Sequence, residues 1–292
     1  VSLVLRGGSY QPESNILPTL DAFNHAMVKA IDGSGKVYWI DPTNYLSMAD
    51  GLFKDIAGKY SLVLDAEKSN YEQIPSILET HAKTLITNTI ARDKMATSRI
   101  ELIGEQAAVL TAYDLYLSKQ GVEDFVFNNF ITNNINTKNR VNSAIPALMS
   151  RVVKPIIISL TFKDPNLFSK TNLGLAYALK TSNLTFVNSI IDVDKQEDVQ
   201  DLYLGYPRTI QRKTIIKDIK VQNIKNLNFK LNNPFVSLSR QAHIEDNDTI
   251  IVEQAIIHKS RIENDKFQSE DFNKLQNAVL DNLIDYSVIL PD

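Results

Sequence analysis

The stretch that decides the fold spans residues 23–43 and reads FNHAMVKAIDGSGKVYWIDPT. Two short runs of residues that favour strands, Phe23 to Ile31 and Lys36 to Ile40, stand on either side of Asp32-Gly33-Ser34-Gly35. A tight, glycine-rich polar turn between two such runs is typical of a β-hairpin. The sequence therefore predicts an antiparallel pair of strands here, and Val1 to Leu5 predicts a further strand before it.

His25 and Asp41 occupy corresponding ends of this hairpin. Antiparallel pairing brings the start of the first strand beside the end of the second, so both side chains can point the same way and meet. An aspartate that accepts a hydrogen bond from an imidazole N–H sets the tautomer of the ring and stabilises its protonated form. The spacing alone fits a base and its orienting carboxylate, but it favours two polar residues that end neighbouring strands by chance.

The segment from Asn24 to Thr43 closely resembles the His and Asp motifs of the transglutaminase-like superfamily, which has a papain-like Cys-His-Asp triad. The resemblance implies that His25 stands for the catalytic histidine and Asp41 for the orienting aspartate. Trp39 and Pro42 match structural positions of the motif. The run from Gly58 to Leu64 is similar to the exit of the core in bacterial members, which are large envelope proteins with β-rich flanking domains.

The resemblance implies two domains: residues 1–65 as the C-terminal half of a transglutaminase-like core, and residues 66–292 as an accessory domain. The family nucleophile is a Cys that precedes the His, and this chain contains no cysteine. We expect either that the chain begins just downstream of that Cys or that the protein is a degenerate member that lost it. In both cases this polypeptide alone is expected to be inactive.

The amino-acid composition excludes several other classes of protein and site. The 292 residues are 43% hydrophobic and carry 31 basic against 34 acidic side chains, for a net charge of -3. A protein whose affinity rests on neutralising phosphates is usually basic, so nucleic acid is not expected as a partner. No apolar run approaches the roughly 20 residues that span a bilayer, so no transmembrane segment is expected in this chain. Without cysteine, disulfides and thiolate metal sites are excluded within these residues.

The rest of the chain predicts an α+β fold that is mostly β, with a jelly-roll-like β-sandwich after the hairpin. Helical spacing predicts helices near residues 105–131 (105–118 and 122–131) and 269–285, the last with Ser269 as N-cap. The short segment 286–290 predicts a closing strand. The other expected strands are 84–90, 97–103, 156–162, 184–193, 209–221, 227–231 and 249–258.

Other polar residues carry weaker signals. His81, His243 and His258 show no metal-binding spacing, and surface or structural roles are expected for them. The run from Glu245 to Asp248 lacks the glycine and the distal glutamate of an EF-hand, so a solvated turn is expected. The glycines of the hairpin do not lie between a strand and a helix, so no nucleotide-binding loop is present.

The function implied for the intact protein is acyl transfer on a protein or peptide substrate, at a Gln carboxamide or a peptide-bond carbonyl. It needs no metal or organic cofactor, and its one required partner is the N-terminal remainder of the same protein. We expect export to the periplasm or cell surface. Two alternatives stay open: a non-catalytic envelope module that binds a glycan or a protein and keeps a relic His25/Asp41 pair, and a purely structural envelope component. Exposed aromatic side chains on one sheet face would favour the binding module.

Overall fold

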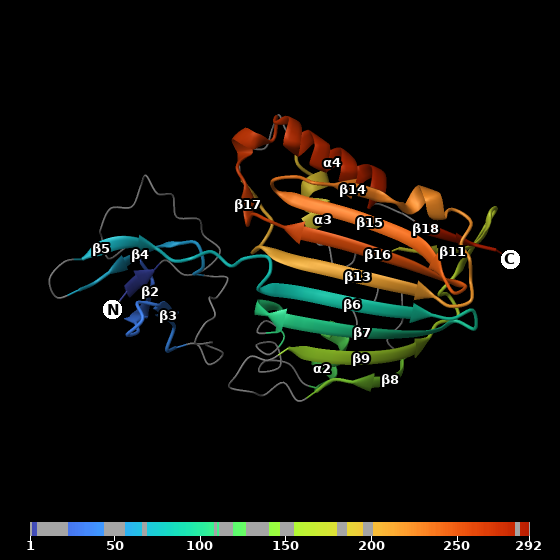
Figure 1. The fold of residues 1–292 in the computed structure, drawn as a ribbon, viewed down its shortest axis with the longest axis horizontal. Helices are drawn as coiled ribbons and strands as arrows, with labels where there is room; N and C mark the ends of the chain where they lie inside the picture. Colours follow the sequence, from blue (N-terminus) through green and yellow to red (C-terminus); the bar gives the residue numbers. More distant parts are fainter. Residues whose placement is uncertain are drawn as a thin grey trace.

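The computed structural model describes residues 2–4, 23–43, 56–65, 69–107, 110, 119–126, 140–146, 155–179, 186–194, 201–283 and 287–291. These residues form a small five-stranded sheet near the N-terminus and a large eight-stranded sheet in the remainder, with two smaller sheets beside it (Figure 1). The predicted class, α+β and mostly β with antiparallel sheets, is confirmed. The jelly-roll arrangement stays a prediction.

The small sheet is antiparallel throughout, in the order β3-β2-β1-β4-β5. Its strands are β1 (Ser2–Val4), β2 (His25–Ile31), β3 (Val37–Ile40), β4 (Tyr60–Val63) and β5 (Asn70–Gln73). The last of them follows the predicted domain boundary at residue 65. Buried apolar side chains on this sheet and the segments next to it form one cluster, which consists of Val4, Met27, Trp39, Ile56 and Ile74.

Asp32 holds the hairpin turn between β2 and β3. Its Oδ1 accepts hydrogen bonds from the backbone N–H of Ser34 at 2.8 Å and of Lys36 at 3.1 Å, and its Oδ2 accepts one from the Tyr38 hydroxyl at 3.0 Å. Gly35 has a φ of +86°, which a residue with a Cβ rarely adopts. The turn chemistry predicted from sequence therefore forms as expected.

The large sheet has the order β14-β15-β16-β13-β6-β7-β9-β8. Neighbouring strands are antiparallel except for β6 and β13, which pair in parallel although they lie more than a hundred residues apart in sequence. The strands are β6 (Ala82–Ile90), β7 (Met95–Gly104), β8 (Arg140–Ala144), β9 (Ile156–Lys163), β13 (Arg208–Ile216), β14 (Phe229–Leu231), β15 (Val236–Glu245) and β16 (Asp248–Ile257).

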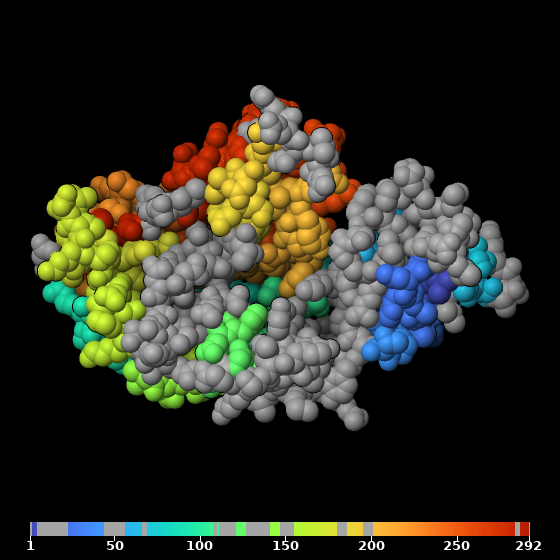
Figure 2. All heavy atoms as spheres, turned by 180° about the vertical axis from the view of Figure 1, so that it is seen from behind, coloured from blue at the N-terminus to red at the C-terminus, as the bar shows by residue number. Residues whose placement is uncertain are grey.

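The two faces of the large sheet differ. Alternate residues such as Ile86, Ile100 and Ile158 are buried and form the covered face, together with residues from helices and from the sheet β10-β11-β18. Figure 2 shows α2 (Lys119–Val126) and α3 (Phe186–Ile191) on the side away from the viewer of Figure 1. The intervening residues, for example Arg99 and Gln241, are exposed on the opposite, open face.

Helix α4 (Glu270–Asn282) forms where the sequence predicts it. The backbone N–H of Phe272 donates to the Ser269 side chain at 3.2 Å, so Ser269 is the N-cap. Leu275 and Val279 are fully buried against the end of the sheet that β15 and β16 form. Arg240 of β15 contacts the C-terminal end of the helix, where its Nη2 donates to the Asn282 carbonyl at 2.7 Å.

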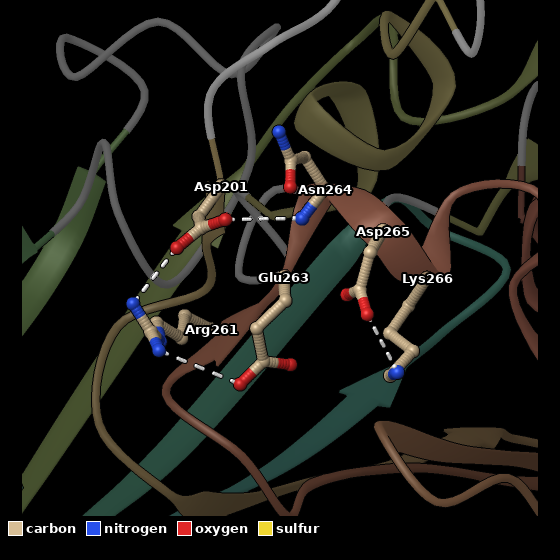
Figure 3. A network of polar contacts seen from close by, with 6 residues as sticks. All are labelled: Asp201, Arg261, Glu263, Asn264, Asp265 and Lys266. Carbon is tan, nitrogen blue, oxygen red and sulfur yellow. Dashed lines mark hydrogen bonds and ion pairs between the residues drawn. The ribbon is translucent and has the colours of Figure 1, made fainter. Parts of the chain in front are cut away.

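A three-stranded sheet and a strand pair complete the described strands. Strands β10 (Ser169–Thr171), β11 (Gly174–Ala178) and β18 (Ser287–Leu290) form one sheet, and β12 (Leu202–Tyr203) pairs with β17 (Arg261–Ile262). Figure 3 shows the polar contacts beside the β12–β17 pair: Asp201 accepts from Arg261 Nη1 at 2.8 Å and from the Asn264 backbone N–H at 3.0 Å.

Some local predictions are confirmed and others are wrong. Strands predicted at 84–90, 97–103, 156–162, 249–258 and 286–290 match β6, β7, β9, β16 and β18. The predicted strand 184–193 is wrong, because residues 186–191 form α3. Its β-branched residues favour a strand locally, but burial of Phe186, Val187 and Ile190 at helical spacing decides the outcome.

The strand predicted at 209–221 ends earlier, at Ile216, because the chain turns at Asp218, which has a φ of +53°. The strand predicted at 227–231 begins at Phe229, since Leu227 ends a short 3-10 helix. Residues 105–107, 110 and 122–126 are helical as predicted, while α2 begins three residues earlier than predicted, at Lys119. The remainder of the helices predicted over 105–118 and 122–131 lies outside the described residues.

Candidate functional site: a histidine and a buried aspartate on one hairpin

His25 and Asp41 lie on the same face of the small sheet. Val28 pairs with Ile40 and Lys29 with Trp39, and this register puts residue 41 opposite residue 27. Since successive side chains alternate between faces, residues 25, 27 and 41 all point to one side. His25 begins β2 and Asp41 directly follows β3, which is the arrangement that the hairpin predicts.

The two side chains are in contact. His25 Nε2 lies 3.0 Å from Asp41 Oδ2, and the side chains are 13% and 1% exposed. The geometry is that of an ion-pair contact and not of an aligned hydrogen bond, since no described residue gives Nε2 a hydrogen bond of good angle. A contact of this length between a ring nitrogen and a carboxylate still identifies Nε2 as the nitrogen turned toward Asp41.

Thr43 fixes the carboxylate from the other side. Asp41 Oδ1 accepts the backbone N–H of Thr43 at 3.0 Å and its hydroxyl at 2.7 Å. Burial by itself would raise the pKa of Asp41, but the two hydrogen bonds from Thr43 and the contact with His25 outweigh it and lower the pKa below its usual value. Asp41 is therefore an ionised, immobilised acceptor beside the imidazole.

Buried apolar residues and polar contacts surround this pair. Met27 is 1% exposed and Trp39 6%, both within the apolar cluster of the small sheet. Lys29, on the same face, has its Nζ 2.6 Å from Glu72 Oε1 and 5.8 Å from the centre of the Trp39 ring. The hydroxyls of Ser2 and Ser61 also contact each other across β1 and β4.

The other histidines are placed differently. His81 is exposed, and His243 lies 3.8 Å from Glu245 with its side chain 56% exposed, as expected for surface residues. The run from Glu245 to Asp248 forms the turn between β15 and β16, with positive φ at Asp246 and Asn247, so the expected turn is confirmed. His258 has two polar partners that sequence reasoning missed, Ser237 and Glu79, because no local motif joins three such distant residues.

Two further observations bear on function. Within the described ranges, no group of three or more His, Asp or Glu side chains is placed to hold a metal ion. The described strands of the large sheet carry two aromatic side chains, Phe162 and Phe229, and both lie on the covered face, so the open face offers no ring on which a sugar could stack. The described strands of the large sheet therefore lack the exposed aromatic face that would favour a glycan-binding module.

Comparison with known proteins found no family model, no curated protein and no solved structure that matches this chain. Among the described residues, no helix has the length and apolar character needed to cross a membrane.

Proposed function

We propose that His25 and Asp41 supply the base and the orienting carboxylate of a Cys-His-Asp triad in a transglutaminase-like acyl transfer. The observation that carries the proposal is the 3.0 Å contact between Nε2 and Oδ2, with Asp41 1% exposed and Thr43 bonded to its second oxygen. A chance pair at the ends of two strands does not require a buried, lowered-pKa carboxylate behind the ring. The resemblance of residues 24–43 to the family's motifs is the second support.

The placement of Asp41 assigns different tasks to the two ring nitrogens. With Nε2 turned to the carboxylate, Nδ1 is the nitrogen that would exchange a proton with the nucleophile. No described residue is hydrogen-bonded to Nδ1. Because this chain contains no cysteine, the thiol would come from another segment of the intact protein.

The reaction then proceeds in two halves. Nδ1 accepts the thiol proton, the thiolate sulfur bonds to the acyl carbon, and the C–N bond of the Gln side chain or peptide breaks as the imidazolium returns the proton to the departing nitrogen. The resulting thioester is resolved when an amine or a water attacks the same carbon and the thiol is restored. Asp41 stabilises the imidazolium throughout and does not itself transfer a proton.

The test uses the intact protein that carries this chain together with its cysteine. Incorporation of a fluorescent primary amine into a glutamine-containing protein measures transfer, and release of peptide fragments measures hydrolysis. His25→Ala is expected to abolish both, and Asp41→Asn to lower them by about 10⁴-fold because the amide cannot stabilise the imidazolium. His243→Ala is the matched control, since this histidine is exposed on the large sheet, and it should keep full turnover.

Two results would overturn the proposal. Full thiol-dependent activity after both His25→Ala and Asp41→Asn would move the chemistry elsewhere. An intact protein that shows neither reaction but binds an envelope protein or glycan would favour the non-catalytic module. Export to the periplasm or cell surface is part of the same proposal, and fractionation that finds the intact protein only in the cytosol would contradict it.

A further inference from the structure

A cluster of a hydroxyl, an imidazole and a carboxylate lies on the large sheet, away from the hairpin pair. Ser237 Oγ is 2.8 Å from His258 Nε2, and His258 Nδ1 is 3.5 Å from Glu79 Oε1. We infer that Ser237 is an activated serine nucleophile, with His258 as its base and Glu79 as the orienting carboxylate, which reacts with small ester substrates.

Three segments that are distant in sequence build this cluster. Ser237 is the second residue of β15, and its neighbours Val236 and Leu238 are buried on the covered face, so Ser237 points to the open face. His258 directly follows β16, and its backbone N–H donates to the Phe235 carbonyl at 3.0 Å, which continues the β15–β16 ladder.

Glu79 reaches the cluster from the segment that precedes β6. The Thr209 hydroxyl of β13 donates to the Glu79 carbonyl at 3.0 Å, so the backbone at residue 79 is tied to the sheet. The carboxylate, the imidazole and the hydroxyl are thus each held by backbone that belongs to, or is bonded to, the large sheet. This is the rigid support that an ordered nucleophile-base pair needs.

The arrangement determines the roles of the imidazole nitrogens. A carboxylate beside Nδ1 favours the tautomer with its proton on Nδ1, which leaves the lone pair of Nε2 to accept the Ser237 hydroxyl proton. A serine, a histidine and a third group that orients the histidine are the recurring parts of an activated hydroxyl nucleophile. The same parts could merely join two strand ends, and that reading predicts no special reactivity at Ser237.

The three side chains of this cluster are accessible to solvent, unlike those of a buried structural network. The side chains of His258 and Glu79 are 30% and 34% exposed, and Ser237 is half-buried. The open face on which Ser237 lies has no covering layer among the described residues. A small ester can therefore approach the hydroxyl from solvent.

The expected reaction is hydrolysis of the ester through an acyl-serine. The Ser237 oxygen bonds to the ester carbonyl carbon while His258 Nε2 takes its proton, and the ester C–O bond breaks as that proton passes to the departing alkoxide. Water then attacks the acyl-serine, with His258 again accepting and returning a proton, which releases the carboxylic acid and restores the hydroxyl. The reaction written in this way requires neither a metal ion nor an oxidant or reductant.

The chain offers a sharp test because it contains no cysteine. Ser237→Cys places one unique thiol at the site, and its alkylation by iodoacetamide reports how far His258 removes its proton. Ser239→Cys is the matched control, since Ser239 lies two residues along the same strand, is half-buried on the same face and contacts no histidine among the described residues. We expect alkylation about tenfold faster at residue 237, and His258→Gln should remove the difference.

A second experiment uses the chain without cysteine substitutions. A fluorophosphonate probe should label Ser237 by mass spectrometry, with labelling lost in His258→Gln and slowed in Glu79→Gln, and p-nitrophenyl acetate hydrolysis should follow the same order. Circular dichroism spectra like that of the parent chain show that each variant is folded. Equal alkylation at residues 237 and 239, or labelling that persists unchanged in His258→Gln, would overturn the inference.

Discussion

The two sheets of this protein are stabilised in different ways. In the described residues, the small sheet has strands of three to seven residues and one cluster of five buried apolar side chains. The large sheet has strands of up to ten residues and two clusters, of 23 and 15 buried apolar side chains. Since buried apolar area scales with these numbers, the large sheet has much the greater hydrophobic stabilisation.

Polar contacts help to define the geometry of the small sheet. Asp32 organises the turn, Thr43 fixes Asp41, and Lys29 pairs with Glu72. Directional hydrogen bonds position side chains more tightly than a small apolar cluster can, which suits a site where His25 must face Asp41. The comparison teaches that the region with less core is the one that holds the candidate active-site pair.

Arg240→Ala gives the largest expected loss of stability, about 3–5 kcal/mol, because it removes a buried guanidinium that is paired with the partly buried Glu253. Arg240 is 1% exposed and bonds both Glu253 Oε1, at 3.1 Å, and the Asn282 carbonyl. Urea unfolding followed by circular dichroism measures the loss. Lys213→Ala, on the open face of the same sheet, is the control. An equal loss of unfolding free energy in the two variants would contradict the expected contribution of the Arg240 contacts.

Leu275→Ala tests whether the two sheets unfold separately, and it should cost about 2–5 kcal/mol through the cavity it leaves. Trp39, the only tryptophan, lies in the small sheet's cluster, so its fluorescence reports that sheet, while circular dichroism reports both. Because Leu275 belongs to a different cluster, we expect the circular dichroism transition to move and the fluorescence transition to stay.

Met27→Ala is the matched partner of Leu275→Ala, since Met27 packs in the same cluster as Trp39, and it should shift the fluorescence transition instead. If both probes move together in both variants, the two sheets form one cooperative unit and the comparison fails.

The smallest expected effect concerns the exposed turn. Hydrogen bonds from Ser34 and Tyr38 lower the pKa of Asp32 to about 2. A carboxyl whose folded pKa is lowered stabilises the fold above its unfolded pKa of about 3.9, and this contribution is lost as the pH falls toward 2. NMR titration of Ser34→Ala with Tyr38→Phe should show the pKa of Asp32 raised toward its usual value, whereas an unchanged pKa would contradict the turn geometry.

Much of the local structure could be predicted from the sequence, because its causes are local. The Asp-Gly-Ser-Gly turn specifies the hairpin, and the hairpin alone brings His25 and Asp41 to one end of a ladder. Ser269 before an apolar stripe specifies α4 in the same way. Strict alternation of apolar and polar residues identifies β6 and β7, since each has one buried and one open face.

Other features depend on residues far apart in the chain, and only the tertiary structure decided them. Strand β15 was not predicted, because Arg240 occupies a position that faces the covered side of the sheet. The burial of Arg240 is tolerated because Glu253 and the carbonyl of Asn282 at the end of α4 accept its hydrogen bonds. The run 186–191 became a helix because α4 and the sheet bury its apolar face. The parallel pairing of β6 with β13, and the meeting of Glu79, Ser237 and His258, have no local signal at all. The sequence by itself determined turns, caps and alternation, which act between near neighbours, whereas long-range burial and pairing determined which segments meet.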